Sequence, residues 1–251
     1  MSTLAIIPAR WESTRFPGKA LCDIGGKPML QWVWEQAMQA KNLGQVVIAT
    51  DDERIRRVGN GFKAEVVMTR KTHPSGTDRC AEAALLYPRH DVVINLQGDM
   101  PFLKPAIINR LAAHMEENPE LEMATCAVPS NDSNLILSPG TAKVVVDGNG
   151  NALYFSRSPI PCPKEGVGMI FHKDENLPPY LIHLGVYAFR RDFLQTFTKL
   201  PPGKCEAVEG LEQLRALENG YRIGVVLVQE QPLHVDTPRD AEKARACIPD
   251  K

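Results

Sequence analysis

Several common sequence signatures are absent from this chain of 251 residues. Its six cysteines include no Cys-x-x-Cys pair and no Cys/His cluster with zinc spacing, so we expect reduced thiols and no structural zinc. No apolar run approaches the ~20 residues of a membrane span, and arginines occupy the N-terminal stretch where a signal peptide has its apolar core. We therefore expect a cytoplasmic protein that does not enter a membrane.

An excess of one charge sign is also lacking. The chain has 29 basic and 30 acidic side chains, whereas nucleic-acid binders normally carry a basic excess or stripe, so we expect no nucleic-acid partner. The phosphate-binding patterns Gly-x-x-x-x-Gly-Lys-Ser/Thr and Gly-x-Gly-x-x-Gly are missing too. Any phosphates would therefore be held mainly by side chains.

Suitable side chains stand in the first loop. The apolar run from Leu4 to Ile7 breaks at Pro8 into a segment too irregular for a helix, which predicts a buried strand followed by a loop. Arg10, Arg15 and Lys19 put three cations on that loop, and a polyphosphate would best compensate their mutual repulsion. The alternative is an ordinary solvated basic turn.

Alternation of strands and helices predicts the fold class. We expect strands at 4–8, 45–50, 65–69, 91–96 and 122–128, separated by helices at 29–40, 52–59, 77–86 and 104–118. Apolar strands alternating with helices are typical of an α/β, doubly wound, mainly parallel sheet, which binds ligands at the carboxyl ends of its strands.

The pattern changes near residue 129. Two short apolar runs, 142–146 and 152–156, flank a turn-forming segment and predict an antiparallel hairpin, followed by a proline-rich irregular stretch at 159–179. Helices at 191–198, 207–219 and 238–247 and a strand at 223–229 complete the pattern. The predicted organisation is an α/β domain of 1–128 and 181–251 with a small β/irregular lobe of 129–180.

Polar strings follow three further predicted strands. Ser75 and the residues after it fit a helix N-cap, or a surface for a base or phosphate. Asp99 and Asp236 each follow a strand, where either is explained as a turn or capping residue, whereas two carboxylates on one rim suit Mg²⁺.

A second group of polar residues suits an acidic sugar. Arg157 and His183 stand at strand ends and could bind a carboxylate and hydroxyls, although a lone histidine is more often structural. Glu209 and Gln213, four residues apart, share a face of the predicted helix, which alternatively is its solvated side.

Ten strings, taken in order, closely resemble the 3-deoxy-manno-octulosonate cytidylyltransferases, or CMP-Kdo synthetases, over nearly the whole chain. They are the strings at residues 6–10, 13–19, 49–51, 68–70, 75–79, 97–99, 152–157, 183–187, 211–215 and 235–238. The resemblance implies a nucleotide-diphospho-sugar transferase fold in a homodimer, with 129–180 as the dimerisation lobe. It also implies that CTP and a sugar acid give a CMP-sugar and pyrophosphate for lipopolysaccharide biosynthesis.

The resemblance further assigns roles to individual residues. The CTP site would comprise Pro8, Ala9, Arg10, Arg15, Lys19, Ser75, Gly76, Arg79, Gln97 and Gly98. The magnesium ligands would be Asp99 and Asp236, which with Arg10, Arg15 and Lys19 form the catalytic set. The sugar pocket would comprise Arg157, His183, Tyr187, Glu209 and Gln213.

One position departs from the family pattern. Met100 directly follows Gln97-Gly98-Asp99, where many family members have glutamate, so the network around the metal or a sugar contact would differ. Met100 supports the alternative of a non-catalytic nucleotide-binding regulator, whereas Arg10, Lys19, Asp99 and Asp236 together oppose it. Two alternative substrates for the same reaction are the 8-amino analogue of the octulosonate and, as the weaker alternative, a sialic acid.

Overall fold

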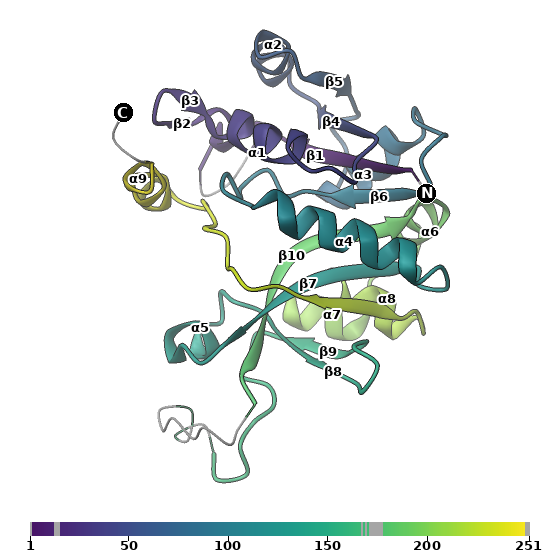
Figure 1. The fold of residues 1–251 in the computed structure, drawn as a ribbon, viewed down its shortest axis with the longest axis vertical. Helices are drawn as coiled ribbons and strands as arrows, with labels where there is room; N and C mark the ends of the chain where they lie inside the picture. Colours follow the sequence, from purple (N-terminus) through teal and green to yellow (C-terminus); the bar gives the residue numbers. More distant parts are fainter. Residues whose placement is uncertain (1, 13–15, 167, 169, 171–177, 249–251) are drawn as a thin grey trace.

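A computed structural model describes residues 2–12, 16–166, 168, 170 and 178–248 of the chain. Its main sheet has nine strands, seven of them in the spatial order β11-β7-β10-β6-β1-β4-β5 (Figure 1). β1 (Thr3–Ala9), β4 (Gln45–Thr50), β5 (Glu65–Met68) and β6 (Val92–Asn95) are mutually parallel. The α/β class and this parallel half are therefore as the sequence predicts.

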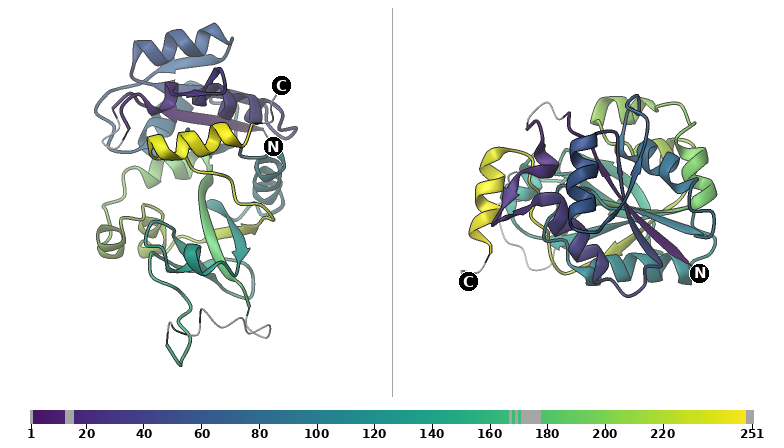
Figure 2. Two further views of the ribbon diagram at one scale, coloured as in Figure 1. Left: turned by 90° about the vertical axis from the view of Figure 1, so that its left-hand side faces the viewer. Right: turned by 90° about the horizontal axis from the view of Figure 1, so that it is seen from above.

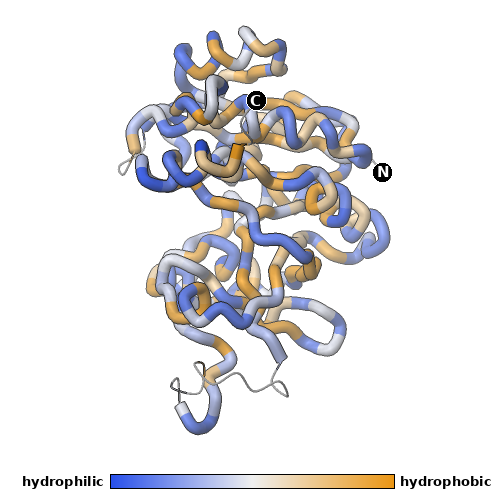
Figure 3. Tube along the Cα trace, turned by 60° about the vertical axis from the view of Figure 1, so that its left-hand side comes forward, coloured by the Kyte–Doolittle hydropathy of each residue, from blue (hydrophilic) through white to orange (hydrophobic). Residues whose placement is uncertain are grey.

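Both faces of the parallel half are covered by helices. Along β1, Ala5 and Ile7 belong to one core cluster and Leu4 and Ile6 to another, because successive side chains of a strand point to opposite faces. The first cluster includes residues of α1 (Met29–Met38), α2 (Glu53–Gly61) and α4 (Pro105–Glu117), and the second includes α3 (Gly76–Ala84) and α6 (Arg191–Phe197). In Figure 3, orange hydrophobic segments run through the middle of the molecule and blue segments are frequent at its periphery.

The interior strand β10 (Tyr180–Arg190) is antiparallel to both of its neighbours in this order. It pairs antiparallel with β6 and with β7 (Met123–Ser130), while the edge strand β11 (Ile223–Leu227) is parallel to β7. A register shift between His183 and Tyr187 contains Gly185, whose φ of +71° is a conformation that suits glycine. The sequence pattern did not predict this strand over its full length.

The predicted antiparallel hairpin is confirmed. β8 (Lys143–Val146) pairs with β9 (Ala152–Ser156), and the Asp147 carboxylate accepts hydrogen bonds from the backbone N–H groups of Asn149 and Asn151 in the turn. β8 also pairs with β10, so the hairpin extends the main sheet, and the short helix α5 (Ser133–Leu137) precedes it. The separate lobe at 129–180 stays a prediction, and much of its proline-rich stretch lies outside the described residues.

One predicted helix is wrong. Instead of a helix over 207–219, the structure has α7 (Lys204–Glu209) and α8 (Leu214–Glu218). Gly210 adopts a left-handed conformation with φ of +60°, which ends α7. The connecting residues 210–213 therefore leave the helical path and bring Glu212 and Gln213 toward the sheet.

The C-terminal part returns to the carboxyl edge of the parallel strands. After β11 the chain crosses the molecule to α9 (Pro238–Ala246), which contacts a small hairpin of β2 (Asp23–Ile24) and β3 (Lys27–Pro28), as both views of Figure 2 show. Ile24, Met29, Val235 and Ala241 form a small core there. Within the described part of the chain, no helix combines the length and apolar character of a membrane span.

Candidate active site

A cavity of about 320 Å³ opens where β1 and β6 end and α3 begins. Its lining residues are Pro8, Ala9, Arg10, Lys19, Ala20, Met29, His73, Ser75, Gly76, Arg79, Gln97, Gly98, Asp99 and Asp236. The structure thus gathers nearly all residues of the predicted CTP and magnesium sites, although their roles stay predictions. Arg15 lies outside the described residues.

The segment after β1 delivers Lys19 to this cavity. The Gly18 N–H donates to the Trp11 carbonyl over 2.9 Å, and the φ of +71° at Gly18 turns the chain into the short 3₁₀ helix η1 (Lys19–Leu21). A Cβ atom at Gly18 would lie 3.0 Å from the Trp11 ring. Glycine at this position therefore closes the loop against the tryptophan and fixes where Lys19 starts.

Lys19 joins the two predicted metal ligands. Its Nζ lies 2.9 Å from Asp99 Oδ2 and 3.1 Å from Asp236 Oδ1. A backbone hydrogen bond of 2.9 Å from Val235 N to the Asp99 carbonyl holds the two carboxylates at one place. Burial alone would lower the pKa of Lys19, but the charges and hydrogen bonds of Asp99 and Asp236 raise it above its usual value, so Lys19 stays a cation.

The same carboxylates have capacity for a bound metal. Among the described residues, the buried Oδ1 of Asp99 has no hydrogen-bond partner, and no group of three or more His, Cys, Asp or Glu side chains forms a metal cluster. Two carboxylates share one cation here, and one of their buried oxygens has no partner. This arrangement suits Mg²⁺, which proteins bind through one or two carboxylates together with substrate phosphates.

The first turn of α3 forms another wall. Ser75 is the N-cap, and its Oγ accepts a hydrogen bond from Asp78 N. A Cβ at Gly76 would lie 3.3 Å from Pro8 Cγ, and one at Gly98 would lie 3.2 Å from the Pro8 carbonyl oxygen. Glycine at both positions lets the walls from β1, β6 and α3 approach closely.

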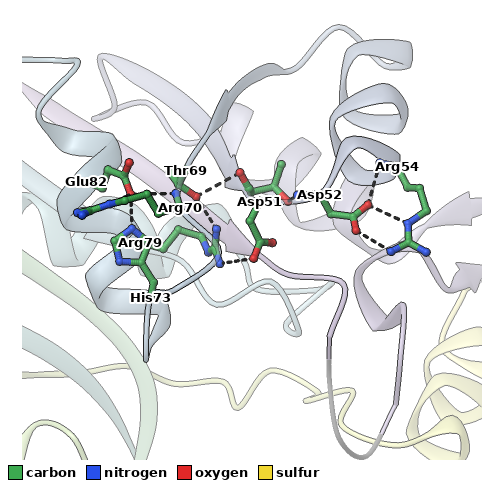
Figure 4. Close-up of polar contacts among 9 residues, drawn as sticks. Asp51, Asp52, Arg54, Thr69, Arg70, His73, Arg79 and Glu82 are labelled. Atoms are coloured by element: carbon green, nitrogen blue, oxygen red, sulfur yellow. Dashed lines mark hydrogen bonds and ion pairs between the residues drawn. The ribbon is translucent and has the colours of Figure 1, made fainter.

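Arg79 lies at the base of the cavity in a fixed position. Its side chain is 4% exposed, forms a 3.0 Å ion pair with Asp51 and donates to Thr69 Oγ1 (Figure 4). Thr69 in turn donates to the Thr50 carbonyl over 3.1 Å. These contacts join the ends of β4 and β5 to α3 and keep a buried positive charge beside the cavity.

His73 lines the same cavity, and the sequence pattern did not identify it. It contacts the Glu82 carboxylate, which also accepts from the Arg70 backbone N–H over 3.1 Å (Figure 4). His73 lies in a turn before Ser75, and the only signal in the sequence is its proximity to the string that begins at Ser75.

A second cavity of about 590 Å³ adjoins the first, with Asp236 in both linings. Its lining residues are Gly140, Thr141, Ala142, Arg157, His183, Leu184, Gly185, Tyr187, Leu211, Gln231, Pro232, Leu233, His234 and Asp236. Three of the five predicted sugar-binding residues are present. In the described part of the chain, Glu209 and Gln213 do not line either cavity.

Arg157 is fixed by backbone carbonyls. Its guanidinium donates to the carbonyls of Glu209, Pro139 and Gly210 over 2.6, 2.9 and 3.3 Å. The Glu209 carboxylate accepts from Ser156 Oγ and from the Arg157 backbone N–H over 2.6 and 2.8 Å. Glu209 therefore positions the end of β9 and, through it, Arg157.

His183 is neutral in the second cavity. Burial, together with the nearby charge of His234, lowers its pKa to about 3. Thr125 Oγ1 donates to the Val186 carbonyl over 2.6 Å, so its contact of 2.9 Å with His183 Nε2 requires the histidine to donate. The proton is thus assigned to Nε2, and Nδ1 is an acceptor.

Gln213 reaches this cavity through Tyr187. The Tyr187 hydroxyl donates to Gln213 Oε1 over 2.9 Å, and Gln213 is only 2% exposed. Its Nε2 is buried without a partner among the described residues, which leaves an amide donor unsatisfied beside the cavity.

Met100 belongs to the hydrophobic core. It is fully buried in the core cluster that contains Leu96, Leu103 and Ile107. The residue that departs from the family pattern is therefore a core residue next to Asp99, and the Asp99 contact with Lys19 is present.

Comparisons with known proteins show the family to which the chain belongs. A family model for cytidylyltransferases matches residues 4–223. The 3-deoxy-manno-octulosonate cytidylyltransferase of Geobacter sulfurreducens is 47% identical, over 97% of this chain and 98% of its own. That of Vibrio cholerae serotype O1 is 44% identical, over 100% and 99%.

Solved structures extend the similarity. A CMP:2-keto-3-deoxy-manno-octonic acid synthetase complexed with CTP has a TM-score of 0.89 at 41% identity, over 98% of both chains. A 4-diphosphocytidyl-2C-methyl-D-erythritol synthase from Anaerococcus prevotii, with a TM-score of 0.61 at 15% identity, shares the fold alone. The resemblance predicted from the sequence is thereby confirmed: the chain belongs to the cytidylyltransferase family, among the 3-deoxy-manno-octulosonate cytidylyltransferases, and is a nucleotidyltransferase.

Proposed function

We propose that this enzyme transfers the cytidylyl group of CTP to 3-deoxy-manno-octulosonate, giving CMP-3-deoxy-manno-octulosonate and pyrophosphate for lipopolysaccharide biosynthesis. The observation that carries the proposal is the pair of adjoining cavities that share Asp236. One is lined by Arg10, Lys19 and Arg79 and suits a triphosphate, and the other is lined by Arg157 and His183 and suits an acidic sugar.

In this proposal the first cavity binds CTP. Arg10 and Lys19 contact the triphosphate, and Pro8, Ala9 and Gln97 surround the nucleoside. The backbone N–H groups at the start of α3 face the same space and favour negative charge, as helix N-termini do. Arg79, fixed by Asp51, adds a cation that needs no rearrangement when the nucleotide arrives.

Asp99 and Asp236 would hold Mg²⁺. Their fit rests on the unpartnered Asp99 Oδ1 and on the cation, Lys19, that they already share. When bound, Mg²⁺ supplies Lewis-acid chemistry, which activates a coordinated hydroxyl and neutralises phosphate charge. With the metal in place, the Lys19 ammonium would no longer be needed between the carboxylates and would contact the triphosphate.

The second cavity binds the sugar acid. Two N–H groups of the Arg157 guanidinium remain for the sugar carboxylate after its three backbone contacts. His183 Nδ1 accepts from a sugar hydroxyl, and Gln213 acts through Tyr187, which lines the cavity and donates to Gln213. Glu209 acts through Arg157, because it holds the backbone from which that side chain starts.

The reaction is a single in-line displacement. The anomeric hydroxyl oxygen of the sugar loses its proton to water and attacks the α-phosphorus of CTP, the bond to the bridging oxygen of the β-phosphate breaks, and pyrophosphate leaves with that electron pair. Lys19 and Arg10 stabilise the charge that accumulates on pyrophosphate. The two substrates meet where the cavities join, so no covalent enzyme intermediate is needed.

We also propose a cytoplasmic homodimer that associates through the 129–180 region. Two apolar side chains exposed in and beside it, Leu153 on β9 and Val208 on α7, at 62% and 88%, support an interface. Light scattering should give the mass of a dimer, and charged substitution of Leu153 should shift the mass toward a monomer. A dimer that persists in that variant would contradict this interface.

Pyrophosphate release tests the catalytic proposal. CTP and Mg²⁺ are incubated with 3-deoxy-manno-octulosonate, with its 8-amino analogue or with N-acetylneuraminate under identical conditions. Release with the first sugar alone is expected. Release with only one of the others would reassign the substrate, and no release with any of them would favour a nucleotide-binding protein without catalysis.

A further inference from the structure

Behind the first cavity, Glu212 contacts both hydroxyl side chains at the start of α3. Glu212 Oε1 lies 2.9 Å from Ser75 Oγ, and Oε2 lies 2.9 Å from Thr77 Oγ1. Glu212 comes from the break between α7 and α8, which the sequence pattern did not predict. Its hydrogen bonds join this break to the turn that forms a wall of the proposed nucleotide site.

The hydrogen atoms of this network can be counted. Ser75 Oγ lies within hydrogen-bond distance of two carboxyl oxygens, Asp78 Oδ2 at 2.6 Å and Glu212 Oε1 at 2.9 Å, and accepts from Asp78 N at 3.2 Å. A hydroxyl has only one proton to donate. If both carboxyl groups were ionised, one of these two short contacts would place two acceptors against each other.

One extra proton gives each of these contacts one donor and one acceptor. If Glu212 Oε1 carries it, Glu212 donates to Ser75, and Ser75 donates to Asp78. On the other side, Asn95 Nδ2 donates to Thr77 Oγ1 over 3.2 Å, and Thr77 donates to Glu212 Oε2 over 2.9 Å. Each hydroxyl then donates one hydrogen bond. Glu212 Oε1 donates through its proton, and Glu212 Oε2 and Asp78 Oδ2 accept.

Burial identifies Glu212 as the group that carries the proton. Desolvation raises the pKa of Glu212 above 4.5, and the charge of Asp78 raises it further, although its hydrogen bonds from Thr77 and Ser75 and the charge of Arg215 lower it. Cys80 of α3 and Tyr187 of β10 also interact with Glu212, and burial together with Glu212 raises the pKa of both. At neutral pH both are therefore uncharged.

We propose that Glu212 is a neutral carboxylic acid that donates to Ser75 and thereby positions the first turn of α3 against CTP. Glu212 acts through Ser75 and Thr77, so it is a positioning residue. Its neutrality also keeps a negative charge away from the wall that faces the triphosphate. The part that concerns CTP rests on the proposed function, whereas the protonation of Glu212 does not.

The sign of the pH effect follows from the network. A carboxyl group that is protonated in the folded protein stabilises the fold at low pH, and this contribution is lost as pH rises through the pKa of the folded state. Above that pKa, ionised Glu212 repels Asp78 and disturbs the Ser75 cap. Glutamine has the same shape, an amide donor for Ser75 and an oxygen for Thr77, and does not ionise.

The test compares the wild type with Glu212→Gln, Glu212→Ala and the control Glu242→Gln, at an exposed glutamate of α9. Infrared difference spectra should contain the carbonyl stretch of a protonated carboxyl group that disappears in Glu212→Gln and stays in Glu242→Gln. In thermal unfolding from about pH 5 to about pH 9, the midpoint of the wild type should fall relative to Glu212→Gln as pH rises. The KM for CTP should rise about tenfold in Glu212→Ala, with a smaller change in kcat.

Three results would overturn the proposal: no such infrared band, a midpoint difference that does not change with pH, or a Glu212→Gln protein that does not fold. The infrared spectra and unfolding curves need no substrate. If pyrophosphate release fails while both behave as expected, the proposed function is wrong and the neutral Glu212 stands. A KM for CTP that is unchanged in Glu212→Ala would remove the positioning role.

Discussion

The two cavities are built in different ways. The first is bounded by charged side chains that pair with one another, such as Lys19 with Asp99 and Arg79 with Asp51, at the ends of parallel strands. The second is built where the antiparallel strands β8, β9 and β10 meet, and there Lys143 of β8 and Arg157 after β9 donate to backbone carbonyls. A triphosphate and a metal can replace ion pairs, whereas a sugar needs hydrogen-bonding groups held at fixed positions.

The difference separates the expected effects of mutation. In the first cavity, substitutions change charge near the reacting phosphates and should act on turnover, because charge stabilisation in a closed site is a large catalytic contribution. In the second, they should act on binding of one substrate and on stability. The following predictions test whether this separation holds.

The largest effect is expected for Asp99→Asn. The amide removes a charge from the proposed metal site, so turnover should fall at least about 10³-fold even at saturating Mg²⁺. Because Asp236 still pairs with Lys19, the thermal midpoint should change little. Asp192→Asn, at a side chain that is 90% exposed, is the control. Normal pyrophosphate release by Asp99→Asn would remove Asp99 from the metal site.

A smaller effect on turnover is expected for Lys19→Ala. Loss of one cation from the triphosphate site should lower kcat/KM by about 10²-fold. The variant also leaves Asp99 and Asp236 to repel each other, so added Mg²⁺ should raise its thermal midpoint more than that of the wild type. Lys27→Ala, which removes a partly exposed pair with Glu35, should show neither change. Equal Mg²⁺ stabilisation of Lys19→Ala and wild type would contradict the shared cation position.

Lys143→Met tests the second cavity because Lys143 holds the backbone carbonyls of two lining residues, Thr141 and Arg157. Lys143 is fully buried, and its ammonium donates to the carbonyls of Ser138, Thr141 and Arg157. Methionine fills similar space but leaves these acceptors unpaired, which should cost about 3 kcal/mol of unfolding free energy.

The kinetic effect of Lys143→Met should be confined to one substrate. The KM for the sugar acid should rise while the KM for CTP stays within about twofold, because Thr141 and Arg157 line only the second cavity. Lys243→Met on the exposed face of α9 is the matched control. A rise in the KM for CTP comparable to that for the sugar acid would break the separation of the two cavities.

The sequence predicted the first cavity better than the second, because the two are built from different kinds of strand. The residues of the first lie within short strings after strands that the apolar pattern predicts, so the amino-acid sequence alone places Lys19, Ser75 and Asp99 on one edge of the sheet. The sequence analysis did not identify His73 because a histidine in a turn belongs to no periodic pattern. That Lys19 joins both carboxylates depends on a contact across 217 residues, which no local pattern contains.

The second cavity was less predictable because its parts come from distant elements. β10 is antiparallel and interrupted at Gly185, so neither strand alternation nor βα spacing identifies it. The break at Gly210 replaces the predicted helix, because a left-handed glycine outweighs the surrounding helical pattern. Glu209 and Gln213, expected to share a helix face, therefore belong to different segments and act through Arg157 and Tyr187.

The smallest and most selective effect is expected for Tyr187→Phe. Phenylalanine fills the same space but leaves Gln213 Oε1 without its donor, which should cost about 1 kcal/mol and lower the thermal midpoint by roughly 3 °C. Because that bond fixes Tyr187 in the wall of the second cavity, the KM for the sugar acid should rise about fivefold, with the KM for CTP unchanged. Tyr221→Phe, at a ring packed on Phe193, is the control. An unchanged KM for the sugar acid, together with the loss of stability, would make Gln213 a structural residue and leave the second cavity to Arg157 and His183.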